Sequence, residues 1–170
     1  MSTSNLLDQK TQALKFMLAG KATFTFKSLK SGKHFTYKIT APKDKDKDAG
    51  SPIYFVSVLT GSDNNSSYTY LGCIKNATTS NPVYVHGVKS PIGATAESNV
   101  VFSFVWNFLI KGQICSAMEI WHEGMCCRCG RKLTTPESIA AGIGPECMSH
   151  KEKATKRKVA TTNTRINLTF

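Results

Sequence analysis

The cysteine pattern near the C-terminus constrains this chain more than any other feature. Cys126 and Cys129 are separated by two residues and followed by Gly130, and Cys147 comes directly after a Gly-Pro-Glu segment. A Cys-x-x-Cys pair can present both sulfurs to one ion from a tight turn, because the glycine lets the backbone fold back beneath them. Three thiolates and one imidazole suit Zn²⁺ in a structural role. The pattern therefore predicts a C-terminal module stapled by zinc.

The fourth ligand is less defined by the sequence than the three thiols. His122 stands four residues before Cys126 and is the first choice, whereas His150, three residues after Cys147, is its competitor. Cys127 is a weaker alternative, because two adjacent cysteines do not easily point at one ion together with Cys129. The predicted metal site is therefore His122, Cys126, Cys129 and Cys147, with His150 and Cys127 kept as alternatives.

The motifs of catalytic zinc enzymes do not fit this chain. A nucleobase deaminase needs His-x-Glu with Pro-Cys-x-x-Cys well downstream, but here His122 and Glu123 are adjacent and Cys126 follows closely without a proline. His-Glu-x-x-His, a phosphate loop and Gly-x-Ser-x-Gly are absent as well. Four protein ligands would leave no position for water. We expect a protein that is not an enzyme, and a metal-dependent enzyme is the weakest hypothesis.

The composition predicts an intracellular protein with a hydrophobic core. The chain has 170 residues, of which 41% are hydrophobic, but it lacks the run of about 18 apolar residues that a membrane span needs. Its first residues do not show the basic-then-apolar order of a secretion signal. Six cysteines in a reducing compartment are read as metal ligands and free thiols, with Cys73 and Cys115 as packing residues. We expect a cytoplasmic protein and no membrane or small-molecule partner.

The net charge of +11 is concentrated at the two ends of the chain. Residues 1–50 hold ten basic against four acidic residues, and residues 126–170 hold nine against three, while the middle is nearly neutral. A positive surface attracts phosphate polyanions, although lysines also serve simply to keep a small protein in solution. The clustering favours a nucleic-acid partner.

Alternation and periodicity predict an α+β fold. It comprises an antiparallel β-meander of four to five strands packed with two helices, plus the C-terminal His/Cys₃ zinc module. We divide the chain into a meander domain (1–115), a zinc module (116–150) and a basic flexible tail (151–170). The expected strands are Thr23–Leu29, Lys33–Ile39, Ile53–Leu59, Tyr68–Ile74, Val83–His86 and Met118–His122, and the expected helices are Asn5–Leu18 and Glu97–Ile110, with short helices near 134–142 and from about Pro145.

Aromatic and basic residues interleave in the predicted meander. Bases stack on exposed aromatic faces with roughly 1–3 kcal/mol each, but for any one aromatic a place in the core is the better prediction. Tyr68 and Tyr70 share a face and are the best candidates for stacking. The predicted nucleic-acid contacts are Lys27, Lys33, Tyr68, Tyr70, Arg128, Arg131, Lys132, Lys151, Lys153, Lys156, Arg157 and Lys158.

The segment from Trp121 to Cys147 resembles a known pattern, with Cys-Gly-Arg-x-Leu-Thr followed by Gly-x-Gly-Pro-x-Cys. It is similar to a small zinc-binding module of uncharacterised phage and plasmid-borne bacterial proteins, and covers about 27 residues. The upstream meander, with its segments at 54–64 and 68–72, is also similar to full-length phage members of that group. The resemblance implies Cys126, Cys129 and Cys147 as ligands with His122 as the fourth, and it implies a phage context without supplying an activity.

Two functional hypotheses follow. The first is a non-enzymatic phage-type zinc protein that binds single-stranded DNA or RNA with low sequence specificity in the host bacterial cytoplasm. The second is a protein-binding module that docks on a host enzyme, such as RNA polymerase or a defence protein. Salt dependence separates them, because binding through several phosphates weakens steeply as salt rises.

Overall fold

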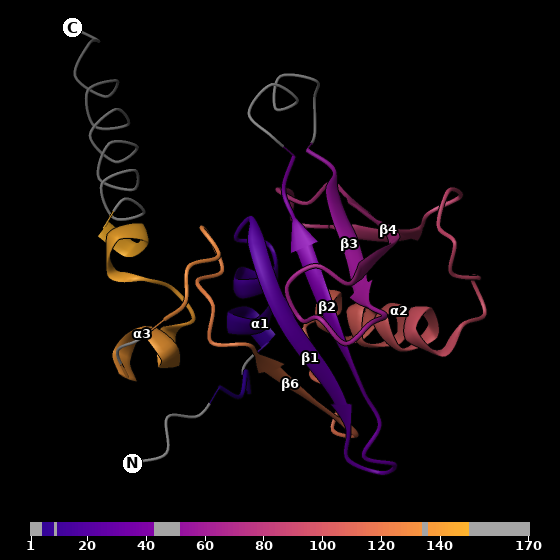
Figure 1. Cartoon of the computed structure of the whole chain (residues 1–170), viewed down its shortest axis with the longest axis horizontal. Helices are drawn as coiled ribbons and strands as arrows, with labels where there is room; N and C mark the ends of the chain where they lie inside the picture. The colour runs from indigo at the N-terminus through magenta and orange to yellow at the C-terminus, as the bar shows by residue number, and fades with distance from the viewer. Residues whose placement is uncertain (1–4, 9, 43–51, 134–135, 150–170) are drawn as a thin grey trace, which may run out of the picture.

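A six-stranded antiparallel sheet forms the centre of the molecule (Figure 1). The computed structural model describes residues 5–8, 10–42, 52–133 and 136–149. Its strands are β1 (Lys21–Ser28), β2 (His34–Thr40), β3 (Tyr54–Leu59), β4 (Tyr68–Lys75), β5 (Val83–His86) and β6 (Met118–His122), and its helices are α1 (Lys10–Met17), α2 (Glu97–Ile110) and α3 (Pro136–Ala141). The predicted α+β class is confirmed.

The order of the strands is β5-β4-β3-β2-β1-β6. The first five strands form the predicted meander, because each pairs with the next one in the sequence. β6 returns after α2 to the free side of β1, where Phe24 lies opposite His122 and Phe26 opposite Ile120. The sixth strand, β6, was predicted as Met118–His122 within the zinc module, and in the structure it joins the meander as a neighbour of β1.

Residues 5–7 protect the outer edge of β6. Leu6 forms an isolated bridge with Trp121, the Leu7 N–H donates to the Ile120 carbonyl, and the His122 N–H donates to the Asn5 carbonyl. An edge strand presents unpaired backbone groups that need partners. The predicted helix at Asn5 is therefore wrong over its first turn, and α1 begins at Lys10.

The inner face of the sheet carries the core beneath α1 and α2. Alternate residues of β1 and β2, including Phe24, Phe26 and Tyr37, are fully buried. Phe102 from α2 lies 5.1 Å from the Tyr37 ring and 5.9 Å from the Phe26 ring, and the Tyr37 hydroxyl donates to the Ser98 carbonyl at 2.8 Å. α2 thus packs across the meander through aromatic contacts.

The opposite face of the sheet has no helix over it within the described part of the chain. We call it the outer face, and Figure 1 shows it with α1 and α2 on the far side of the strands. Successive side chains of a strand point to opposite faces of the sheet, so the residues next to the buried ones belong to the outer face. It includes Lys21, Thr23, Thr25 and Lys27 of β1, Thr36 and Lys38 of β2, Phe55 and Ser57 of β3, and Tyr68 and Tyr70 of β4.

Helix length also bears on membrane association. None of the helices in the described segments is both long enough and apolar enough to cross a bilayer. The longest, α2, has 14 residues.

Candidate metal centre and the adjoining sheet face

A tight hairpin at residues 124–133 carries the Cys-x-x-Cys pair. The Cys126 N–H donates to the Arg131 carbonyl at 2.8 Å, and the Gly130 N–H donates to the Cys126 carbonyl at 2.8 Å. Gly124 and Gly130 have φ values of 69° and 76°, which a residue with a Cβ adopts only at a cost. The two glycines therefore let the chain turn back sharply. We call this hairpin the zinc turn, after the metal that the sequence predicts for it.

Three of the predicted ligands come together at the zinc turn. The sulfurs of Cys126, Cys129 and Cys147 all lie within 4.8 Å of one another. Tetrahedral coordination with Zn–S bonds of about 2.3 Å separates sulfurs by about 3.8 Å, so a small closure of this group would enclose an ion. Cys147 comes from a short helical segment at 145–149, close to where the sequence predicts it. These three thiols can hold a metal ion.

The local charges fit a cation between the sulfurs. Burial alone would raise the pKa of the Cys126 thiol, but backbone N–H groups of Gly144, Cys129 and Arg128 lower it to about 7. The Gly144 N–H lies 3.4 Å from the Cys126 sulfur. Burial and the two neighbouring thiols raise the pKa of Cys147 to about 12. One thiolate therefore forms readily, and a bound divalent cation would remove the repulsion that opposes the others.

His122 lies outside this group of sulfurs. It is 3% exposed, and its ring lies 5.4 Å from the Phe16 ring on the inner side of the sheet. Its Nδ1 accepts a hydrogen bond from the Gly124 N–H at 3.1 Å, while Nε2 has no partner within the described residues. Burial lowers the pKa of His122, although the Ile139 backbone and the Glu123 carboxylate act in the opposite direction.

The register of β6 explains this position. His122 pairs with Phe24 and shares the inner face with Ile120, so its side chain is directed into the core and braces the start of the zinc turn. The clustered group therefore contains three of the four predicted ligands, and His122 as the fourth ligand stays a prediction. The separation of four residues predicted that His122 lies near Cys126. It did not predict the face of β6 from which the imidazole projects.

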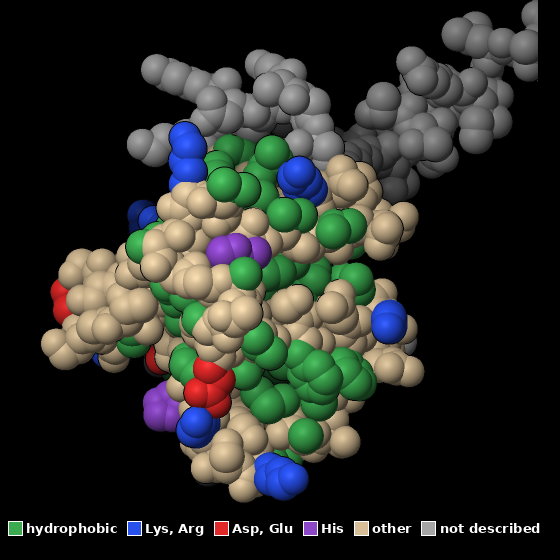
Figure 2. Space-filling view, turned by 90° about the vertical axis from the view of Figure 1, so that its right-hand side faces the viewer, with side chains coloured by type: hydrophobic (Ala, Val, Ile, Leu, Met, Phe, Trp, Pro, Cys, Tyr) green, Lys and Arg blue, Asp and Glu red, His purple; other side chains and the backbone are tan. Residues whose placement is uncertain are grey.

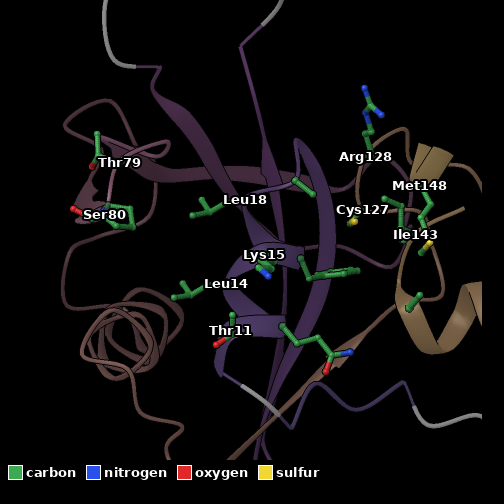
Figure 3. Close-up of a pocket in the computed structure, with 15 residues that line it drawn as sticks. Thr11, Leu14, Lys15, Leu18, Thr79, Ser80, Cys127, Arg128, Ile143 and Met148 are labelled. Carbon is green, nitrogen blue, oxygen red and sulfur yellow. The ribbon is translucent and has the colours of Figure 1, made fainter. Parts of the chain in front are cut away.

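The alternative ligands differ in where they lie. Cys127 is buried in the hydrophobic core, where its N–H donates to the Gly142 carbonyl at 3.0 Å. It also lines an open cavity of about 940 Å³ beside α1, together with Leu14, Ile143 and Met148 (Figure 3). His150 lies outside the described residues. Among the other thiols, Cys115 is buried as expected and Cys73 is half-buried.

The zinc turn is attached directly to the sheet and to α1. The Lys21 N–H of β1 donates to the Cys127 carbonyl at 2.8 Å. A Cβ at Gly130 would lie only 3.0 Å from the Lys21 Cδ, and a Cβ at Gly142 would lie 2.7 Å from the Phe16 ring. A metal that fixed the three sulfurs would therefore also fix these contacts with β1 and α1.

The predicted basic contacts are distributed over several surfaces. Lys27 is exposed on the outer face, and Lys132 is exposed on the zinc turn. Lys33 forms an ion pair with Glu97 at 3.0 Å, and Arg131 forms one with Glu146 at 3.3 Å. The Arg128 guanidinium donates to the Cys147 carbonyl at 3.0 Å. The remaining candidates, Lys151, Lys153, Lys156, Arg157 and Lys158, lie outside the described residues.

The aromatic side chains divide between the two faces of the sheet. Tyr68 and Tyr70 lie together on the outer face, where the Lys38 ammonium sits 3.8 Å from the centre of the Tyr68 ring. Phe55, which the sequence analysis did not single out, is 44% exposed and lies 6.5 Å from the Tyr70 ring. The signal was present, because Phe55 alternates with Val56 in a strand whose valines are buried.

Comparison with known proteins finds a match for the segment around the zinc turn and none for the rest of the sheet. Residues 121–150 match a family described as "Family of unknown function (DUF6011)". This match covers the zinc turn, α3 and all three clustered cysteines, and it is consistent with the module that the sequence resembles. The chain matches no curated protein and no solved structure.

Proposed function

We propose that this chain is a non-enzymatic, phage-type zinc protein that binds single-stranded DNA or RNA with low sequence specificity through the outer face of its sheet, in the bacterial cytoplasm. The observation that carries the proposal is the shared position of aromatic rings and lysines on a face without a covering helix in the described chain. Phe55 of β3 and Tyr70 of β4 offer ring surface. Lys21 and Lys27 of β1 and Lys38 of β2 offer positive charge on the neighbouring strands of the same face.

The chemistry of this face suits an unpaired strand. Each base has a π-face that can stack on an aromatic ring, worth roughly 1–3 kcal/mol, whatever its sequence. Lysines interact with the phosphates that follow the strand, and this attraction is independent of the base. The face also carries Glu119 and Glu123 near β6, so its positive potential is greatest over β1 and β2.

Zinc has a structural part in this proposal. When bound, the ion would join the three thiolates and stiffen the zinc turn, which has too small a core of its own to be stable alone. The Cys127 carbonyl, which accepts the Lys21 N–H, would then keep Lys21 in place at the border of the outer face.

Fluorescence anisotropy with 20-nucleotide single-stranded RNA and DNA tests the proposal. At 50 mM salt the zinc-loaded protein should bind both strands, and duplexes of the same length should bind more weakly. Replacing Phe55 and Tyr70 with alanine together should reduce strand affinity by about tenfold or more, because two stacking surfaces are lost. Absence of binding to either strand at 50 mM salt would refute the proposal.

Phe104→Ala is a matched control for the loss of an exposed aromatic ring. Phe104 lies on α2, away from the outer face, and is 50% exposed against 44% for Phe55. This variant should bind strands as the wild type does. An equal loss in Phe55→Ala and Phe104→Ala would show that the outer face is not the site.

A second candidate function is supported by α2. Val100, Phe104 and Phe108 recur every four residues along one side of this helix, and the Phe104 and Phe108 rings lie 4.9 Å apart. Figure 2 shows hydrophobic side chains gathered over the side of the molecule where α2 lies. Exposed apolar patches of this kind favour protein partners. A host enzyme such as RNA polymerase or a defence protein is the partner that this second candidate requires.

Binding to purified bacterial RNA polymerase separates the two candidates. If the second is correct for this enzyme, Phe104→Ala should weaken the complex while Phe55→Ala should not, and the affinity should change little between 50 and 200 mM salt. The reverse pattern in strand binding supports the first candidate.

A further inference from the structure

The outer face contains a hollow beside the zinc turn. It has a volume of about 280 Å³ and forms where β1 and β2 meet the β3–β4 turn and the zinc turn. Lys21 and Thr23 line it from β1, Lys38 from β2, Asn64 from the β3–β4 turn, Tyr68 from β4 and Glu123 from the end of β6. We call this hollow the outer-face pocket.

Two ammonium groups give the pocket its positive side. Thr23 pairs with Lys38 across β1 and β2, and Lys21 lies two residues before Thr23 on the same face. Neither lysine forms an ion pair with a described acidic residue. Burial lowers the pKa of Lys38, the neighbouring Lys21 lowers it further, and Asp63 partly opposes both. A phosphate between the two ammonium groups would relieve this repulsion.

The rest of the pocket offers uncharged donors and one fixed acceptor. The Thr25 hydroxyl donates to the Glu123 carboxylate and thereby holds it at the pocket wall. The Thr23 hydroxyl and the Asn64 amide can each donate and accept. A carboxylate would repel a bare anion but accepts hydrogen bonds from hydroxyl and amine groups. The combination suits a ligand that joins a phosphate to such groups.

We propose that the outer-face pocket is the subsite for one nucleotide of the bound strand. The phosphate lies between Lys21 and Lys38, and the sugar hydroxyl or the base edge is directed to Thr23, Asn64 and Glu123. This inference rests on the proposed function, in which the strand continues over Tyr70 and Phe55. The volume is near the lower end of small-ligand pockets, about 300–1,000 Å³, and so fits a single nucleotide unit.

The zinc turn forms one wall of this subsite. Gly130 lines the pocket, and its missing Cβ leaves room for the Lys21 methylenes, since a Cβ there would lie 3.0 Å from Cδ. The backbone N–H of Lys21 is held by the Cys127 carbonyl. The position of the Lys21 ammonium therefore depends on the conformation of the zinc turn, which links the metal centre to the nucleotide subsite.

Titration of the ¹⁵N-labelled, zinc-loaded full chain with uridine 5′-monophosphate and its 2′-deoxy form tests the subsite by NMR. Both nucleotides should shift the backbone amides of Lys21, Thr23, Lys38 and Asn64, because DNA and RNA share the phosphate and base edges. Lys21→Ala should weaken nucleotide binding at least tenfold, and Thr23→Val should weaken it by a smaller factor. Lys111→Ala removes the same charge at the end of α2 and should leave binding unchanged.

Two results would overturn the subsite. One is a failure of localisation, seen as shifts no larger in the pocket than in α2 together with equal affinity in Lys21→Ala and Lys111→Ala. The other is inorganic phosphate binding as tightly as the nucleotides, which would identify a simple anion site. Strand binding by the wild-type protein is measured separately, so a failed subsite with intact strand binding leaves the proposed function standing. Absent strand binding would instead remove the proposed function itself.

Discussion

At the scale of single residues, the three clustered thiols are chemically unequal. Cys126 is buried and stabilised as a thiolate by backbone N–H groups, whereas Cys129 and Cys147 are more accessible. Spacing predicted which cysteines come together, because a Cys-x-x-Cys turn is a local structure. It did not predict that His122 faces the core, because that depends on how β6 pairs with β1. His150, the competing fourth ligand, lies outside the described residues, so the structure does not test it.

Replacing His122 with asparagine tests its structural position. The asparagine carbonyl can accept the Gly124 N–H in place of Nδ1, so the zinc turn should keep its shape. His122→Asn should retain one zinc per chain and lose no more than about 10–100-fold in zinc affinity, the range for residues that support metal ligands without binding the ion. Loss of the metal, measured by competition with a chromogenic chelator, would show that His122 is a ligand after all.

Metal binding should release protons at pH 7.5. Cys126, with its pKa lowered to about 7, is mostly thiolate at this pH, but Cys147, with its pKa raised to about 12, is protonated and must lose its proton to bind the ion. Isothermal titration calorimetry in two buffers with different ionisation enthalpies should therefore show release of at least one proton per zinc. Affinity should fall below about pH 7, where Cys126 also binds a proton. Zero proton release would contradict this description.

At the scale of elements, alternation predicted the strands closely. The predicted strands lie within about two residues of β1 to β6, and α2 has the predicted bounds. The buried side of α2 was not predicted: Phe102 and Trp106 are buried, whereas Phe104 is half exposed. A helix that is apolar nearly all around does not reveal from sequence which side meets the sheet. The position of β6 in the sheet could not be predicted from the sequence either, because β6 pairs with β1, which lies about 95 residues earlier.

Gly72 should be essential for the pairing of β4 with β5. A Cβ there would lie 2.4 Å from the Val85 carbonyl oxygen, and this backbone atom cannot move without breaking the strand pair. Gly72→Ala should lower the free energy of unfolding by about 1–3 kcal/mol, as overpacking does. Thermal denaturation of Gly93→Ala gives the control, because no atom lies within 4 Å of a Cβ at that position. Equal melting temperatures would contradict the close approach of β4 and β5.

At the scale of the whole molecule, the two sides of the sheet present different surfaces. α1 and α2 cover one side of the sheet, and α2 presents an apolar row, while the other side presents lysines and aromatic rings. Sequence alternation placed Tyr68 and Tyr70 on one face, but that this face is uncovered depends on where α1 and α2 pack. The match of residues 121–150 to DUF6011 carries no known activity, so the proposed function rests on the outer face.

Strand binding should depend steeply on salt. If about three phosphates of a single strand are neutralised by Lys21, Lys27 and Lys38, a plot of log affinity against log salt should have a slope of about −2. Lys21→Ala should make this slope shallower by about 0.7, whereas Lys111→Ala should not change it. The measurement is fluorescence anisotropy between 50 and 200 mM salt. An affinity that is constant over this range would argue against phosphate contacts.

The most direct test of the account measures the metal content of the chain purified without chelators. Native mass spectrometry and elemental analysis should find one zinc ion per chain in the wild type and in Cys73→Ser, whose thiol lies outside the clustered group. Cys129→Ser should lose the ion and the stability of the zinc turn, because one of three clustered thiols is gone. A wild type without stoichiometric metal, or a Cys129→Ser variant that binds zinc as tightly as wild type, would contradict the account.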